Sequence, residues 1–240
     1  MPGEIAVIVT AHNEADRLPE TLTALREAFP AARLIVADDA STDATGHAAL
    51  QAGAELVRAP RRLGKGGAAT LAARRLLEGA AGGSAPGADR AASSDGHAPT
   101  LVLCDGDLGT SAGLLPKLVA ALERGDGDLA VAAFARRVGG GFGIALGFAR
   151  VVIRRLTGLE PQAPISGQRA LRPEVVPAVL PFAHGFGMET AMTIDAHRAG
   201  FRLAEVELDL EHRATGRTAG GFLHRATQLR DILRVYCSRA

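Results

Sequence analysis

Residues 4–39, EIAVIVTAHNEADRLPETLTALREAFPAARLIVADD, predict a strand, a helix and a second strand in succession. Residues 4–10 form an apolar run rich in β-branched side chains, which is typical of a strand buried on both faces. Leucines recur near helical spacing within residues 15–29, and a second apolar run follows at residues 33–37. Because a crossover helix joins strands that run in the same direction, this stretch predicts an α/β fold with a mostly parallel central sheet.

The same alternation of apolar runs and helical patterns continues along the chain. Further strands are predicted at residues 55–58, 100–104, 129–134 and 202–210, with a turn and a short strand within 163–171. Further helices are predicted at residues 42–52, 66–78, 113–124, 143–157, 173–180, 188–199 and 221–236. We therefore expect helices on both faces of the sheet.

One segment interrupts this alternation. Residues 79–99 are dominated by Gly, Ala, Ser and Pro and show no apolar period, which predicts a flexible surface loop. The strand and helix pattern resumes directly after it, so we expect an insertion within a single domain that spans residues 1–240.

The composition excludes several classes of protein. The chain has 240 residues, 47% of them hydrophobic and 22% charged, as in ordinary globular domains. A formal net charge of +1 offers no basic field for nucleic acid, and two cysteines are too few for a disulfide framework. The longest apolar stretch, residues 142–159, contains three arginines, and the first residues lack the layout of a signal peptide. We expect a cytoplasmic protein with no nucleic-acid partner.

Acidic side chains follow three of the predicted strands. The sequence reads AHNE at residues 11–14, DD at residues 38–39 and DGD at residues 105–107. Because the carboxyl ends of parallel strands meet at one edge of a sheet, these side chains are expected to gather there. Crowded carboxylates repel one another unless a cation or hydrogen-bond donors offset their charge.

The DGD segment has the spacing of a metal site. Asp105 and Asp107 face the same side of an extended segment, and Gly106 between them lets another group approach. Two such carboxylates suit Mg²⁺ or Mn²⁺, which keep coordination positions open for substrate phosphates. The alternative is that these aspartates only cap a helix. Their place at the end of a buried strand favours the metal site.

Two other segments at this edge suit a phosphorylated ligand. Asp38 or Asp39 could accept a hydrogen bond from a nucleobase or a ribose hydroxyl, or one of them, or Ser41, could cap the next helix. Lys65, in the sequence LGKGG at residues 63–67, opens a predicted helix and suits an anion. The chain has neither a Walker P-loop nor a G-x-G-x-x-G after the first strand, which disfavours an NTPase and a dinucleotide dehydrogenase.

The segments VIVTAHNEADRLPETLTAL, LIVADDASTDAT, RRLGKGGA and LVLCDGDLGTS together resemble the nucleotide half of family 2-type glycosyltransferases with the GT-A fold, the Rossmann-like fold of nucleotide-diphospho-sugar transferases. The second half resembles glucosyl-3-phosphoglycerate synthases and polyprenyl-phosphate sugar transferases in the segments VGGGFG, PISGQRAL, HGFGMETAMTIDAHRAGFRLAEVEL and EHRATGR. The resemblance implies a hexosyltransferase that uses Mg²⁺ or Mn²⁺. Residues 1–110 would bind the nucleotide sugar and residues 111–240 the acceptor.

The resemblance also implies roles for individual residues. Asp107 and His212 would hold the metal, and Glu189 would act with Asp107 in catalysis. The nucleotide sugar would contact Ala11, Asn13, Glu14, Asp38, Asp39, Lys65, Gly66, Asp105, Gly106 and Arg213. The acceptor would contact Gly140, Gly141, Ser166, Gly167, Arg169 and Gly187.

Each of the roles in the second half has a plainer alternative. His212 follows the predicted strand 202–210 and can reach the acidic edge, or it is a hydrogen-bonded structural histidine. Glu189 opens a helix, where a carboxylate also favours the helix dipole. Arg213 and Arg217 form an anion-binding cluster or a solvated turn. Five further arginines are candidates for binding a phosphorylated acceptor, against the alternative of a solvated helix face: Arg136, Arg137, Arg154, Arg155 and Arg169.

The sequence leaves rival functions open. A sugar-phosphate nucleotidyltransferase would share the architecture and the metal, but it would carry an arginine-containing glycine-rich loop where this chain has AHNEADRL. A non-enzymatic relative would have no use for the acidic edge. The predicted helix 221–236 places Phe222, Ala226, Leu229 and Leu233 on one face, which suits packing on the domain, a homodimer, or an anionic bilayer and a polyprenyl-phosphate acceptor.

Overall fold

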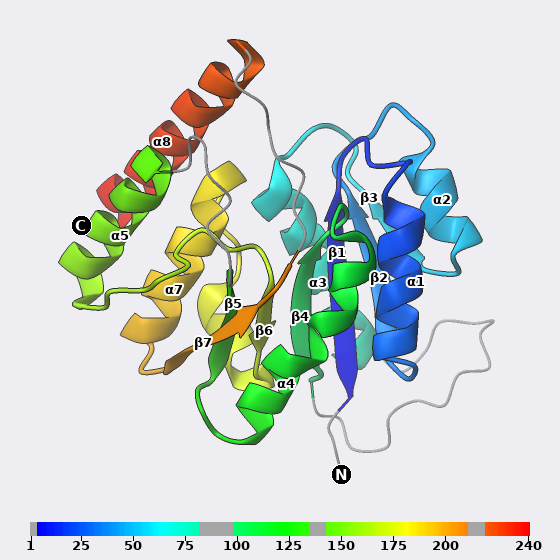
Figure 1. The fold of residues 1–240 in the computed structure, drawn as a ribbon, viewed down its shortest axis with the longest axis horizontal. Coiled ribbons are helices and arrows are strands. Elements are labelled where there is room, and N and C mark those ends of the chain that lie inside the picture. Colours follow the sequence, from blue (N-terminus) through cyan, green and yellow to red (C-terminus); the bar gives the residue numbers. More distant parts are fainter. Residues whose placement is uncertain (1–3, 82–97, 135–142, 211–218) are drawn as a thin grey trace.

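The computed structural model places a seven-stranded sheet between layers of helices (Figure 1). It describes residues 4–81, 98–134, 143–210 and 219–240. The strands are β1 (Ile5–Ala11), β2 (Arg33–Asp38), β3 (Glu55–Arg58), β4 (Thr100–Asp105), β5 (Leu129–Phe134), β6 (Arg169–Leu171) and β7 (Leu203–Leu208). Their order is β3-β2-β1-β4-β6-β5-β7, and only β6 runs antiparallel to its neighbours. The predicted α/β fold with a mostly parallel sheet is confirmed.

The helices follow the predicted pattern with local differences. They are α1 (Leu18–Ala28), α2 (Thr45–Gln51), α3 (Lys65–Ala81), α4 (Pro116–Glu123), α5 (Gly143–Thr157), α6 (Val176–Val179), α7 (Met188–Arg198) and α8 (Ala219–Arg239), with 3-10 turns η1 (Gly109–Leu114), η2 (Pro173–Val175) and η3 (Gly185–Gly187). The helix predicted over residues 113–124 is divided into η1 and α4, and Pro116 opens the second part. The helix predicted over residues 173–180 is likewise divided into η2 and α6.

The loop predicted over residues 79–99 begins too early. Residues 79–81, Gly-Ala-Ala, belong to the last turn of α3, where the two alanines favour helix despite the preceding glycine. Residues 82–97 lie outside the described part of the chain.

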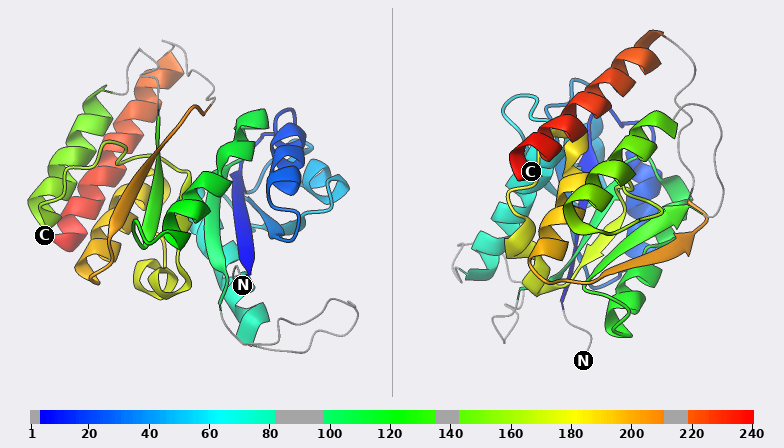
Figure 2. Two further views of the ribbon diagram at one scale, coloured as in Figure 1. Left: turned by 60° about the horizontal axis from the view of Figure 1, so that its bottom comes forward. Right: turned by 90° about the vertical axis from the view of Figure 1, so that its left-hand side faces the viewer.

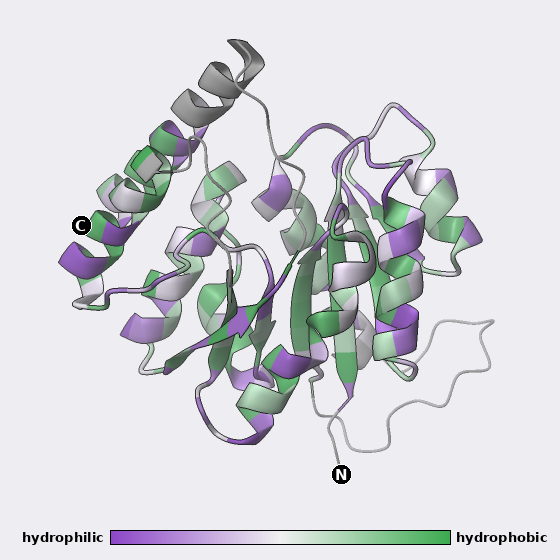
Figure 3. Cartoon of the chain, viewed as in Figure 1, coloured by the Kyte–Doolittle hydropathy of each residue, from purple (hydrophilic) through white to green (hydrophobic). Residues whose placement is uncertain are grey.

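Alternate side chains of the strands enter two separate apolar layers. Val7 and Val9 of β1 pack beneath α1, η1 and α4, whereas Ala6 and Ile8 pack against α3, α6 and α7. Figure 3 shows β1 and β4 as hydrophobic along most of their length. The first strand is therefore buried on both faces, as its continuous apolar run predicts.

The helices α5 and α8 form an outer layer beyond α7. They lie side by side at the edge of the molecule (Figure 2), and residues of α5, α7 and α8 share a third apolar cluster. In α8, Leu229 and Leu233 lie one helical turn apart on the same face, as predicted; Leu229 packs against this cluster and Leu233 is exposed. The side chains of Phe222 and Ala226 lie outside the described residues. None of the described helices is both long enough and apolar enough to cross a membrane.

The strand register determines which residues meet at the carboxyl edge of the sheet. Ala11 pairs with Asp38 across β1 and β2, and Thr10 pairs with Asp105 across β1 and β4. The antiparallel strand β6 places Arg169 opposite Leu103 of β4. The segment that precedes β6 consequently reaches the end of β4, where the DGD segment begins.

The two thiols are expected to differ in reactivity. Cys104 lies in β4 and is 1% exposed, and burial together with the charge of Asp105 raises the pKa of its thiol. Cys237, near the end of α8, is exposed. A thiol reagent such as DTNB should therefore label Cys237 rapidly in the native protein and Cys104 only after unfolding. Rapid native labelling of Cys104 in a Cys237→Ser variant would contradict the burial of β4.

Candidate active site

Lys65 joins two carboxylates at the carboxyl edge of the sheet. Its Nζ lies 2.6 Å from Oδ1 of Asp105 and 2.8 Å from Oε1 of Glu189. The three side chains come from the first residue of α3, the last residue of β4 and the first turn of α7. The side chains of Lys65 and Glu189 are only 21% and 5% exposed, so the attraction between them is weakly screened by water.

The positive charge of Lys65 is retained throughout the neutral pH range. Burial lowers the pKa of the Lys65 ammonium, but the carboxylates of Asp105 and Glu189 raise it by more, and the net direction is upward. A raised pKa means that the stabilisation from this pair of contacts is fully present below the usual lysine pKa and is lost only at strongly alkaline pH.

The second oxygen of Asp105 is also occupied. Gln168 donates a hydrogen bond from Nε2 to Oδ2 of Asp105 at 2.7 Å, and Thr10 donates to Oδ1 at 3.2 Å. Ser166 in turn donates to Oε1 of Gln168 at 3.3 Å. The orientation of the Asp105 carboxylate is therefore set from β1, from α3 and from the segment before β6.

Gly167 leaves the space in which Lys65 and Asp105 meet. A Cβ atom at this position would overlap Nζ of Lys65 and would lie 2.7 Å from Oδ2 of Asp105. Gly167 therefore lies directly against the charged pair, and its contact with the acceptor stays a prediction.

Asp107 differs from Asp105 in its surroundings. It is half-buried, and its carboxylate forms no hydrogen bond or ion pair with any other residue that the structure describes. A carboxylate with this freedom at the sheet edge is the hard oxygen donor that Mg²⁺ or Mn²⁺ prefers, and these ions complete their shells with water and substrate phosphates. No group of three or more His, Cys, Asp or Glu suited to a metal occurs within the described ranges, from which residues 211–218 and thus His212 are missing. The described donor set fits such an ion through Asp107.

Asp38 and Asp39 accept hydrogen bonds from backbone N–H groups of the loops that surround this edge. Asp39 accepts hydrogen bonds at Oδ1 from the backbone N–H groups of Leu63 (2.6 Å) and Gly64 (3.1 Å). Asp38 accepts one at Oδ1 from the N–H of Ser41, and its Oδ2 lies 3.6 Å from Nε of Arg58. Both aspartates are buried. Their contact with a nucleobase stays a prediction.

The capping alternative for these residues is wrong. The helix α2 begins at Thr45, and the carboxylate that accepts the N–H of Thr45 belongs to Asp43. Asp38 instead accepts the N–H of Ser41, in the loop before α2, and Asp39 accepts the N–H groups of Leu63 and Gly64, in the loop before α3. The hydroxyl of Ser41 accepts the N–H of Asn13.

The loop after β1 is tied to the loop after β2. Asn13 adopts a φ of 57° and accepts the N–H of Thr42 at Oδ1, and the N–H of Glu14 binds Oγ1 of Thr45. Ala11 also packs closely against Gly106: a Cβ atom added at residue 106 would lie only 3.3 Å from the Cβ of Ala11. These contacts place the predicted donor-binding residues of the first half on one continuous edge.

Two of the predicted binding residues have structural roles. Arg169 is fully buried, and its guanidinium donates to the carbonyls of Ser166 and Pro164 and to the hydroxyl of Thr193. Burial lowers the pKa of Arg169 to about 10, although Glu189 and Glu205 raise it. A Cβ at Gly66 would overlap the carbonyl oxygen of Ala183, so this glycine allows α3 to pack against the segment before α7. Arg169 offers no exposed charge to an acceptor in this structure.

The helix α8 holds the turn that leads into Glu189. Asp231, 3% exposed, accepts the N–H of Phe186 at Oδ2 at a distance of 3.3 Å. Gly185 has a φ of 59°, and a Cβ there would overlap Oδ2 of Asp231. A Cβ at Gly187 would lie 2.6 Å from Cγ2 of Val235 and 3.0 Å from the carbonyl oxygen of Asp231. Both glycines of η3 therefore allow α8 to lie directly on the turn.

Gln168 and Asp231 are the site residues that the sequence patterns missed. Gln168 stands within the quoted PISGQRAL segment, directly before β6, which begins beside the end of β4; no periodic pattern in the sequence singles it out. Asp231 is the one acidic residue of α8, and a single acidic residue in a helix with several arginines is a sequence signal that could have singled it out. The predicted residues Gly140, Gly141, His212 and Arg213 lie outside the described residues, as do Arg136, Arg137 and Arg217.

A mostly parallel sheet of this order, with a charged DGD edge and a helix opened by a lysine, is the architecture of a GT-A glycosyltransferase, and the chain is a glycosyltransferase with that fold. The sequence model of the family described as Glycosyl transferase family 2 matches residues 6–77. An undecaprenyl-phosphate mannosyltransferase from Micrococcus luteus is 29% identical, over 92% of this chain and 90% of that protein.

Solved structures of glucosyl-3-phosphoglycerate synthase from Mycobacterium tuberculosis are also similar. The complex with phosphoglyceric acid is 27% identical, with a TM-score of 0.74 over 99% of this chain and 80% of that one. The complex with Mn²⁺, UDP and glucosyl-3-phosphoglycerate is 26% identical, with the same TM-score and coverage. Both halves of the expected resemblance are confirmed.

Gly167→Ala is expected to lower activity sharply and to destabilise the fold less than removal of the Lys65 charge would, because the ammonium group stays near both carboxylates. The added methyl group displaces the flexible end of Lys65 from Asp105, and a misplacement of this size costs up to about 100-fold in rate. Gly113→Ala is the matched control, because its Cβ would meet no atom within 4 Å. Steady-state turnover of the donor and a thermal melt would measure both effects; full activity of Gly167→Ala would show that the contact is dispensable.

Asp231→Ala is expected to lower kcat by about tenfold, because the turn before Glu189 loses its anchor on α8. Asp231→Asn keeps an oxygen that can accept the N–H of Phe186 and should retain most of the activity. Arg234→Gln is a control that removes only an exposed ion-pair partner of Asp231. If the alanine and asparagine variants lost activity equally, the charge of Asp231 and not its hydrogen bond would matter.

Proposed function

We propose that this glycosyltransferase moves a hexose from a UDP- or GDP-sugar to a phosphorylated acceptor, with Mg²⁺ or Mn²⁺ bound at Asp107. The observation that carries the proposal is the bridge from Lys65 to Asp105 and Glu189. Two residues after Asp105, the carboxylate of Asp107 pairs with none of the residues that the structure describes. One positive and several negative groups would then surround a sugar diphosphate bound at the carboxyl edge of the sheet, where ligands of such folds bind. The solved complex of a similar synthase with Mn²⁺ and UDP supports this assignment.

The donor would lie along the edge formed by the first half of the chain. Ala11, Asn13 and Glu14 border it on one side, and Asp39 holds the loop with Leu63 and Gly64 on the other. The N-terminus of α3 offers a positive end to the diphosphate. Asp105, held by Gln168, would face the ribose or the sugar.

The residues of this chain would assist departure of the nucleoside diphosphate in two ways. Asp107, with His212, would hold the divalent ion, which supplies Lewis-acid stabilisation of the charge on the leaving group when it is bound. Lys65 and Arg213 would contribute fixed positive potential beside that charge. Because Asp105 and Glu189 hold Lys65 in place, little reorganisation is needed as charge develops.

Glu189 would face the sugar and the acceptor. Its Oε1 contacts Lys65, while its Oε2 makes no hydrogen bond to another described residue and is left for a substrate hydroxyl. In an inverting reaction Glu189 would accept the proton of the acceptor as general base, and in a retaining reaction it would orient the substrates. The anomeric configuration of the product, read by NMR, distinguishes the two.

The acceptor has two candidate classes. A small phosphorylated acid is supported by the similarity to glucosyl-3-phosphoglycerate synthase over nearly the whole chain. A polyprenyl phosphate is supported by the similarity to undecaprenyl-phosphate mannosyltransferase at comparable identity and coverage. The nucleotidyltransferase alternative has no such relative among these proteins, and its product would be pyrophosphate instead of a nucleoside diphosphate.

A donor panel tests the proposal. UDP- and GDP-linked glucose and mannose with Mn²⁺ would be scored for thermal stabilisation and for slow hydrolysis, first without acceptor and then with 3-phosphoglycerate or a short-chain polyprenyl phosphate. We expect one nucleotide to raise the melting temperature only when metal is present. No stabilisation by any donor, with or without metal, would contradict the proposal.

Asp107→Asn is expected to lower turnover by about 100- to 1,000-fold, because it removes the carboxylate that would hold the metal. The melting temperature without ligands should not change, since no described residue pairs with Asp107. Asp126→Asn, on an exposed carboxylate remote from the edge, is the control. An active Asp107→Asn enzyme with unaltered Mn²⁺ dependence would refute the metal assignment.

A further inference from the structure

Exposed apolar side chains concentrate on the outer helix layer. Four large hydrophobic residues are widely exposed within the described part of the chain: Leu50 (57%), Ile144 (73%), Val151 (47%) and Leu233 (48%). All but Leu50 belong to α5 and α8, which lie side by side at the edge of the molecule (Figure 2). An isolated exposed leucine needs no explanation, but a group on adjoining helices does.

The exposed residues of α5 form one stripe. Ile144, Val151 and Arg155 are separated by close to whole numbers of helical turns, so they share a face. Ala149 and Ile153, on the opposite face, are buried in the cluster with α7 and α8. The stripe is therefore the outward face of a helix whose inner face is already buried against α7 and α8.

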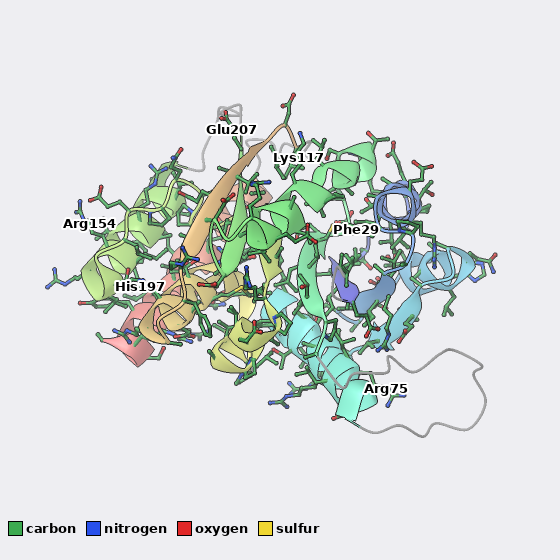
Figure 4. All side chains as sticks on the ribbon, turned by 90° about the horizontal axis from the view of Figure 1, so that it is seen from below. Phe29, Arg75, Lys117, Arg154, His197 and Glu207 are labelled. Carbon is green, nitrogen blue, oxygen red and sulfur yellow. The ribbon has the colours of Figure 1, made fainter. Side chains whose placement is uncertain are left out.

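The outward face of α8 has the same composition. Arg230, Leu233 and Arg234 are exposed, whereas Ile232 and Val235 are buried against α5 and α7. Together with Ile144, Val151 and Arg155, these exposed residues define what we call the α5–α8 face. Figure 4 shows the neighbouring Arg154 at the outer side of α5.

The charge on this face has one sign. The sequence of α5 contains no acidic residue, and the single one in α8, Asp231, is buried, with Oδ2 on η3 and Oδ1 between Arg230 (3.4 Å) and Arg234 (3.6 Å), so this one carboxylate offsets only part of their charge. Glu160, which follows α5, is paired with Arg154 at 3.3 Å. A second copy of the chain placed on this face would bring arginines against arginines, whereas an anionic lipid surface is complementary to apolar side chains bordered by arginines.

We propose that the α5–α8 face docks the enzyme on an anionic bilayer, with both helices lying along the surface and neither crossing it. The contacts of Asp231 with η3 place this face one helix layer from Glu189, so a docked enzyme would hold its acceptor side near the lipid headgroups. The inference goes beyond the proposed function, because it concerns where the enzyme works and does not depend on which acceptor is used.

Flotation with liposomes tests the apolar part of the face. The full chain would be mixed with vesicles of phosphatidylcholine and phosphatidylglycerol, and with vesicles of phosphatidylcholine alone. We expect binding to the anionic vesicles, and a loss of about tenfold or more in Ile144→Glu/Val151→Glu. Leu50→Glu, an equally exposed apolar residue outside the face, is the matched control and should bind like the wild type.

The charge of the face is tested separately. Arg155→Gln/Arg234→Gln should weaken binding to the anionic vesicles by at least about tenfold, since each arginine near such a surface contributes attraction that salt screens. Equal binding to neutral and anionic vesicles, binding unaltered in both double variants, or no binding by the wild type would each overturn the proposal. So would a dimer in sedimentation that Ile144→Glu/Val151→Glu dissociates.

Donor hydrolysis in vesicle-free buffer separates this proposal from the function itself. All the surface variants should hydrolyse the donor at the wild-type rate, because none of the substituted residues contacts the site. Normal hydrolysis with no vesicle binding would overturn the docking proposal alone. Normal vesicle binding with no metal-dependent donor turnover would overturn the proposed function alone.

Discussion

The contact of Lys65 with both Asp105 and Glu189 is the constraint on which the rest of the site depends. Two carboxylates at the ends of β4 and α7 lie too near each other to be tolerated in a low-dielectric environment without a cation between them. Lys65 supplies that charge from the first residue of α3. The positions of a strand and two helices are thus linked through one ammonium group, and Gly167 provides the space in which they meet.

Much of this arrangement could be predicted from local sequence. The apolar runs before residues 11, 38 and 105 specify buried parallel strands, and the acidic edge follows because such strands end together. Gln168 could not be predicted in its role, because β6 has only three residues and its antiparallel pairing with β4 is a long-range event without a periodic signal. Arg169 suggested a ligand contact by its charge, but its hydrogen bonds to Ser166 and Thr193 bury it.

The helix α8 connects the interior of the site to the surface. Its inner face touches η3 through Asp231 and Val235, and the glycines of η3 are needed for that approach. An amphipathic pattern predicts such a helix but not what covers each residue of its apolar face, and Leu229 packs against the cluster with α5 and α7 while Leu233 is exposed. The burial of Asp231 leaves the outward side of α8 apolar and cationic.

A mutant cycle on unfolding tests the central claim most directly. Lys65→Met should cost about 3–5 kcal/mol in urea unfolding at neutral pH, because it leaves two poorly solvated carboxylates facing each other. Adding Asp105→Asn and Glu189→Gln to Lys65→Met should recover most of that loss, since the uncompensated charges are then gone. If the effects were instead additive within about 0.5 kcal/mol, Lys65 would not be bridging these carboxylates and the account of the site would be wrong.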